Sequence, residues 1–149
     1  MTTPATRLRL HSGRTTLADG GAPEVAIGVG AQQLAEQHFR HDLPQPIEIE
    51  RAIDVVEEAL AATGLAHAER GELLIADPVL LAPLGLGTEG MRLTRDEVEE
   101  RFERLATAAL GHPGALAGMP LDRVGAVALL LLRECMHHLG YASVRWVAG

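Results

Sequence analysis

The sequence has no lysine and no asparagine, few aromatic residues and a single cysteine. All thirteen basic residues are arginine, a bias typical of GC-rich and therefore mostly bacterial genomes. Aromatic residues make up 3% of the chain, so the core must be built from Leu, Val, Ile and Ala. One thiol, Cys135, excludes an internal disulfide and indicates a reducing compartment. We therefore predict a cytoplasmic protein.

Long apolar runs and strong basic patches are also missing. The most apolar segment, 124–135, is interrupted by Arg133 and Glu134, well short of the ~20 residues that a membrane-spanning helix needs. The stretch 1–13 lacks the apolar centre of a signal peptide. The net charge is −7, and no arginine cluster exceeds two residues in five, whereas binding a phosphate backbone needs a basic stripe. We predict neither a membrane nor a nucleic acid as partner.

The overall composition is that of a folded protein. Hydrophobic residues make up 47% and charged residues 22% of the 149 positions. This length is enough to bury a core without disulfides, and we predict a single domain covering 1–149.

Apolar and polar residues alternate in several short segments, which is typical of β-strands. In the first segment Leu8 and Leu10 alternate with arginines, and Ser12-Gly13 then supplies a turn, which predicts a β-hairpin. The predicted strands cover 6–10, 14–18, 24–30, 71–78 and 142–148.

Helical spacing of apolar residues dominates the rest of the chain. Pro46 fits a first helical turn, and the pair Thr94 and Glu97 has the spacing of a capping box. The predicted helices cover 31–40, 46–64, 94–111 and 121–139. The last one is apolar on nearly every side, so it lies in the core or packs against a second subunit. Segment 79–91, rich in proline and glycine, is predicted as a loop.

The predicted order of elements is β-β-β-α-α-β-α-α-β, without an internal repeat. Strands and helices alternate in groups, which favours an α+β or mixed α/β fold. We expect one five-stranded mixed sheet covered by helices.

A group of histidines and acids near the first proline pair is a candidate metal site. His38, His41 and Asp42 can share one face if the helix continues to this point. Two carboxylates on one face of the next helix, Glu50 and Asp54, can meet them across the prolines. Imidazoles and carboxylates bind Zn²⁺ or Fe²⁺ and support acid–base chemistry, so a divalent metal is a candidate cofactor. The alternative, which we favour, is an ordinary helix end followed by an amphipathic helix with a solvated acidic face.

Cys135 and His138 are three residues apart on one predicted helix. Such a pair can form a thiolate–imidazolium nucleophile. Cys135 is also in register with Leu131 and Leu139, however, and a buried cysteine usually behaves as a small inert hydrophobe. We favour the core interpretation.

Gly28 and Gly30 follow a predicted strand and open a predicted helix, as in phosphate-binding turns. The third glycine of the dinucleotide-binding motif is replaced by Gln33, and no P-loop motif follows. A cofactor or phosphate site at Gly28 and Gly30 therefore competes with a tight turn that binds nothing, and we favour the turn.

Three functions of different classes fit these residues. We favour a small accessory or binding protein without catalysis. We expect it to form a homodimer, because helix 121–139 and segment 79–87 offer surplus apolar surface. The second is a metal-dependent hydrolase or lyase that uses the histidine and acid group. The third is a phosphate or nucleotide binder at Gly28 and Gly30.

Overall fold

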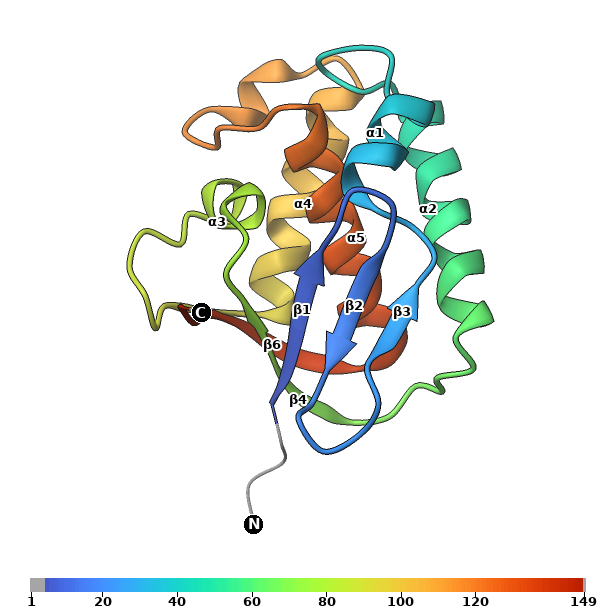
Figure 1. The fold of residues 1–149 in the computed structure, drawn as a ribbon. Coiled ribbons are helices and arrows are strands. Elements are labelled where there is room, and N and C mark those ends of the chain that lie inside the picture. Colours follow the sequence, from blue (N-terminus) through green and yellow to red (C-terminus); the bar gives the residue numbers. More distant parts are fainter. Residues whose placement is uncertain (1–4, 149) are drawn as a thin grey trace.

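A mixed sheet of six strands is the centre of the fold (Figure 1). The computed structural model describes residues 5–148, so residues 1–4 and 149, the ends of the predicted domain, lie outside the described part. The strand order is β3-β2-β1-β4-β6-β5, and the pairs β1–β4 and β4–β6 are parallel. The strands are β1 (Thr6–Leu10), β2 (Thr15–Ala18), β3 (Val25–Ile27), β4 (Arg70–Ile75), β5 (Arg92–Thr94) and β6 (Tyr141–Trp146). The predicted mixed α/β fold is confirmed, with one strand more than expected, β5.

The first two strands form the predicted hairpin. Leu8 pairs with Leu17 in the antiparallel register, and both side chains are buried against the helices. Arg9, the next residue along β1, points to the other face of the sheet because successive strand residues alternate. The alternation of leucine and arginine in this segment therefore separates a core face from a polar face.

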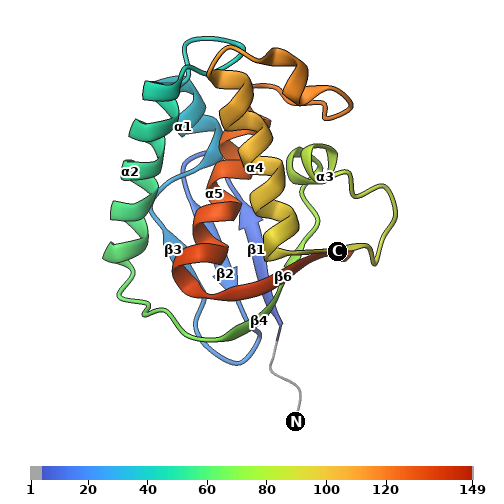
Figure 2. The ribbon, with the colours of Figure 1, turned by 180° about the vertical axis from the view of Figure 1, so that it is seen from behind.

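Helices α2, α4 and α5 lie behind the sheet in Figure 1 and in front of it in Figure 2. The helices are α1 (Ala31–His38), α2 (Pro46–Ala62), α3 (Pro78–Leu84), α4 (Arg95–Ala109) and α5 (Arg123–Leu139), with a short 3-10 turn at Pro113–Leu116. Pro46 is in the first turn of α2, as predicted. The capping box of α4 is confirmed, because Thr94 Oγ1 accepts from Glu97 N–H at 3.2 Å and Glu97 Oε1 accepts from Thr94 N–H at 3.0 Å.

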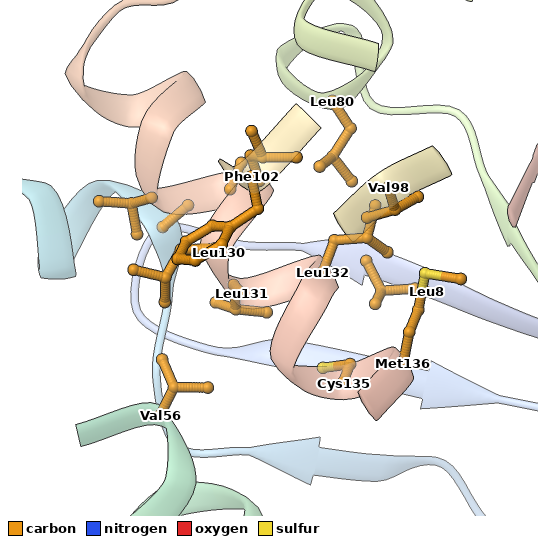
Figure 3. Close-up of a cluster of buried hydrophobic side chains, with 14 of the residues drawn as sticks. Leu8, Val56, Leu80, Val98, Phe102, Leu130, Leu131, Leu132, Cys135 and Met136 are labelled. Atoms are coloured by element: carbon orange, nitrogen blue, oxygen red, sulfur yellow. The ribbon is translucent and has the colours of Figure 1, made fainter. Parts of the chain in front are cut away.

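Helix α5 is the centre of the hydrophobic core. It packs against α1, α2, α3 and α4, and Leu129 to Leu132 are completely buried. Figure 3 shows side chains of α5, including Leu130, Leu131 and Cys135, among residues from the sheet and the other helices. Of the two places predicted for an all-round apolar helix, the structure shows the core.

The prediction of a loop over 79–91 is wrong in its first half. Residues 78–84 form α3, and Leu80, Leu84 and Leu86 are buried. Burial against α5 outweighs the local signals of Pro83 and Gly85, which had indicated a loop. Most of the apolar side chains of α5 and of segment 79–87 are therefore buried within one chain. They leave little apolar surface of the kind that had suggested a dimer.

Candidate functional site

The parallel strands β1 and β4 are neighbours, and the chain leaves their carboxyl ends in opposite directions. From β1 it continues to β2 and β3 on one side, and from β4 it continues through α3 to β5 and β6 on the other. Open α/β sheets bind ligands in the crevice outside the carboxyl ends of their strands, at the point where the strand order reverses. The candidate site is therefore the edge of the sheet formed by the ends of β1 and β4.

Asp77 lies at this edge, two residues after β4. Its Oδ2 accepts a hydrogen bond from the backbone N–H of Leu10, the last residue of β1, at 3.0 Å. Asp77 precedes α3, but its side chain does not cap this helix and contacts β1 instead. The contact fixes a partly buried carboxylate between the two strand ends.

His11 begins the turn between β1 and β2. Its Nε2 lies 3.2 Å from Oγ1 of the buried Thr16, and this contact orients the exposed ring. His11 and Asp77 line two small hollows in common. One hollow of about 220 Å³ also includes Arg7 and Arg9, and a second of about 170 Å³ includes Ser12 and Gln32.

The charges around the first hollow favour an anion. Arg7 and Arg9 supply two positive charges against the single carboxylate of Asp77. This local excess contrasts with the net charge of −7 of the whole chain. Residues of the types that line this hollow, an aspartate, a histidine and two arginines, can bind a phosphorylated ligand and move protons to and from it.

A larger hollow, of about 510 Å³, lies between α3 and the start of α5. Its lining is mostly apolar, including Pro78, Pro83 and Leu121. Its one ionisable residue, Asp122, is engaged as the N-cap of α5, where Oδ1 accepts from Gly125 N–H at 2.6 Å. This hollow offers no group for catalysis.

The predicted group of five metal ligands is not brought together. Helix α1 ends at His38, so His41 and Asp42 lie beyond the helix. Asp42 is fully exposed and contacts Arg123 at 3.2 Å, and Glu50 and Asp54 are exposed on α2. Within residues 5–148, the one group of three His, Cys, Asp or Glu side chains that could hold an ion is a different one, Glu57, Glu134 and His138.

His41 contacts an acid that the predicted metal site did not include. Its Nδ1 lies 3.1 Å from Oε1 of the buried Glu48. Glu48 also accepts from the backbone N–H groups of Arg40 at 2.7 Å and Gln45 at 2.8 Å. Although burial opposes ionisation, these backbone hydrogen bonds and His41 lower the pKa of Glu48 below its ordinary value. The segment between α1 and α2 is thus held by a structural carboxylate, in keeping with the favoured helix-end interpretation.

Gly28 and Gly30 do not line a common site. Gly28 borders a hollow between β3 and α2, together with Val55 and Glu58. Gly30 contacts the β1–β2 turn so closely that a Cβ atom there would lie 2.3 Å from the carbonyl oxygen of Ser12. The same oxygen accepts from Gln33 N–H at 3.1 Å. Gly30 therefore permits a close approach of backbone to backbone, as expected for a tight turn.

Cys135 is completely buried, and burial together with the charge of Glu134 raises the pKa of its thiol to about 12. Its proposed partner His138 instead has Nε2 at 2.9 Å from Glu134 Oε2. Both observations support the core interpretation.

The residues at the β1–β4 edge were missed because no local motif joins them. Asp77 falls within the predicted strand 71–78, and His11 falls between the two strands of the predicted hairpin, so neither position by itself indicated a site. The available signal was a carboxylate directly after an apolar strand, which often marks the ligand edge of an α/β sheet.

Comparison with solved structures shows a known fold. A Ppx/GppA family member from Aquifex aeolicus is 13% identical, with a TM-score of 0.73, over 99% of this chain and 53% of that one. An exopolyphosphatase from Cytophaga hutchinsonii is 12% identical, with a TM-score of 0.69, over 98% and 53%. An exopolyphosphatase-like protein is 16% identical, with a TM-score of 0.69, over 99% and 56%. No protein-family model and no curated protein matches the chain by sequence.

These likenesses establish the fold, and the chain spans just over half the length of the solved chains. The similar proteins are described as phosphatases and exopolyphosphatases. The prediction of an accessory protein without catalysis is therefore contradicted, because the solved structures with this fold are those of enzymes. Between residues 5 and 148, no helix has both the length and the apolarity to cross a membrane.

Proposed function

We propose that this chain is a phosphohydrolase domain that acts on a chain of phosphate groups at the β1–β4 edge. The observation that carries the proposal is the position of Asp77 and His11 around one hollow with Arg7 and Arg9, at the carboxyl ends of two parallel strands. Solved structures with this fold are described as exopolyphosphatases, which supports the choice of substrate.

In the proposed reaction, Arg7 and Arg9 neutralise charge on the phosphate oxygens. Asp77, fixed by Leu10 N–H, accepts a proton from the attacking water while the oxygen of that water forms a bond to the terminal phosphorus. The bond from this phosphorus to the bridging oxygen breaks, and protonated His11 donates its proton to the leaving oxygen. The products are inorganic phosphate and a chain one unit shorter.

A divalent cation fits this proposal through the substrate. Mg²⁺ is commonly held by one or two carboxylates together with substrate phosphates, and Asp77 supplies one such carboxylate. The ion would reduce the charge of the phosphate chain.

The solved chains with this fold are almost twice as long as this chain, so we include a second polypeptide unit in the proposal. We propose that a second copy of the chain faces the β1–β4 edge and completes the cleft, so that the protein acts as a homodimer in the cytoplasm, with no nucleic acid as partner. Light scattering at micromolar concentration should give the mass of a dimer, and a monomeric mass would contradict this part.

The release of inorganic phosphate from linear polyphosphate in the presence of Mg²⁺ tests the reaction. Asp77→Asn keeps an oxygen that can accept from Leu10 N–H but removes the base, so we expect kcat to fall by about 10²-fold or more. Asp54→Asn, at an exposed acid on α2, is the matched control and should leave kcat unchanged.

The arginines are tested through binding. Arg9→Gln should raise KM more than it lowers kcat, because Arg9 is proposed to hold the phosphate chain. A wild-type protein that neither hydrolyses polyphosphate nor binds inorganic triphosphate in calorimetry would refute the proposed function. Equal rates for Asp77→Asn and Asp54→Asn would refute the role of Asp77.

A further inference from the structure

Glu57, Glu134 and His138 form a cluster between α2 and α5, away from the β1–β4 edge. Glu134 and His138 are one turn apart on α5, and Glu57 faces them from α2. This part of α5 adjoins the start of β4, because Arg70 Nε donates to the carbonyl oxygen of Leu139 at 2.8 Å. The cluster therefore lies at the opposite end of the parallel strands from Asp77.

Glu134 is the unusual member because it is a charged group with only 1% of its side chain exposed. Its Oε1 accepts from Arg133 at 2.6 Å. Its Oε2 is buried and has no hydrogen-bond partner among the described residues, although His138 Nε2 lies 2.9 Å away without the alignment of a hydrogen bond. A buried carboxylate oxygen without a donor is costly, so this oxygen requires a positive group in the cluster.

The nearby arginine does not supply the missing charge. Arg133 also makes two bonds to Glu99, at 2.7 and 2.9 Å, and these bonds lower the pKa of Glu99. One guanidinium thus faces Glu99 and Glu134, and Glu57 adds a third carboxylate. With His138 neutral, the three carboxylates of Glu57, Glu99 and Glu134 exceed the single positive charge of Arg133 by two.

The spacing of the three ligand atoms fits a small cation. His138 Nε2 lies 3.4 Å from Glu57 Oε1, and one ligand atom from each residue lies within 4.8 Å of the other two. Zinc bonds of about 2.1 Å in a tetrahedron place ligand atoms roughly 3.4 Å apart. Glu57 and His138 are 45% and 38% exposed, so an ion can enter from solvent and keep a water molecule as fourth ligand.

We propose that Glu57, Glu134 and His138 bind one transition-metal ion of the zinc class, which links α2 to α5. An imidazole with carboxylates suits Zn²⁺, whereas Mg²⁺ and Ca²⁺ prefer sites made of oxygen ligands only. The site does not depend on the proposed phosphohydrolase reaction. The bound ion would instead stabilise the packing of α2 against α5, two helices that are distant in sequence.

Calorimetric titration of the purified chain with Zn²⁺ at pH 7.5 tests the site. We expect one saturable equivalent, and a loss of affinity of tenfold or more in Glu57→Gln and in His138→Gln. Both side chains are partly exposed, so these variants should fold. The matched controls are Glu58→Gln and His137→Gln, which alter the adjacent residue on each helix and should keep the wild-type affinity.

Thermal unfolding provides a second measurement that needs no enzymatic activity. Zn²⁺ at a hundredfold excess over the wild-type Kd should raise Tm by roughly 5–10 °C in the wild type and in Glu58→Gln, and by at most about half as much in His138→Gln. Weak binding of several equivalents that the variants do not alter would show surface association only and overturn the proposal. The proposal is also overturned if the wild-type chain binds no Zn²⁺ in the titration.

Discussion

Gly30 has no room for a side chain, although its backbone would accept one. Its φ of −119° and ψ of 150° are in the extended region that any residue can adopt. A Cβ atom at this position would lie 2.3 Å from the carbonyl oxygen of Ser12 and 2.6 Å from the backbone nitrogen of Gly13. Both contacts are with backbone, which cannot rotate away as a side chain would.

The cost of Gly30→Ala follows from this geometry. Ordinary contacts of a Cβ begin at 3.4 Å, so α1 and the β1–β2 turn must separate by about 1 Å. That movement also breaks the hydrogen bond from Gln33 N–H to the Ser12 carbonyl, now 3.1 Å long. Overpacking costs about 1–3 kcal/mol and the hydrogen bond about 1 kcal/mol, while the stiffer unfolded chain returns about 0.4–1 kcal/mol. We expect Gly30→Ala to lower the free energy of unfolding by about 1–3.5 kcal/mol.

Urea unfolding followed by circular dichroism measures this change as a lower midpoint at an unchanged slope. Gly28→Ala is the matched control, because no atom lies within 4 Å of a Cβ at that position. The control should match the wild type or exceed its stability by up to about 1 kcal/mol. If Gly30→Ala unfolds at the same urea concentration as Gly28→Ala, the close-approach explanation of Gly30 is wrong.

Three further predictions concern buried groups. A thiol reagent should label Cys135 only after denaturation, since the thiol is buried and its pKa is raised to about 12; rapid labelling of the native protein would contradict this. Glu48→Gln should lower the free energy of unfolding by about 1–2 kcal/mol at pH 7. The pKa of Glu48 is lower in the folded state than in the unfolded state. The stability difference between wild type and Glu48→Gln should therefore persist above the unfolded pKa of about 4.3 and vanish as the pH falls through the folded pKa. A difference in urea midpoints that does not depend on pH would argue against a role for the charge. Leu131→Ala should cost about 2–5 kcal/mol in the same assay, because Leu131 is completely buried at the centre of the core, and a cost below 1 kcal/mol would contradict that placement.

Regular periodicity made most of the fold predictable. Helices α2, α4 and α5 were expected close to their observed positions because each has a continuous apolar stripe and a recognisable start, such as Pro46 or the pair Thr94 and Glu97. Helix α3 and strand β5 were missed. Pro83 and Gly85 obscured the first, and β5 is only three residues long and forms through pairing with β6.

The candidate site was harder to predict because it depends on pairing between distant strands. Leu10 and Asp77 are 67 positions apart, and only the parallel alignment of β1 and β4 brings them together. The predicted metal ligands His38, His41 and Asp42 were chosen by their spacing along the sequence. Residues three or four apart share a face only if both belong to the same helix. Helix α1 ends at His38, and His41 therefore reaches Glu48 and not His38 or Asp54.

The two outer strands of the sheet have a consequence for solubility at high concentration. An edge strand presents unpaired N–H and C=O groups that can recruit another chain and begin aggregation. Here the edges are β3 and β5, each only three residues long, and β5 carries the exposed Arg92. Edges so short give an incoming strand few backbone groups to pair with. The sheet is thereby protected against growth from one molecule to the next, and lengthening β5 with apolar residues would remove that protection.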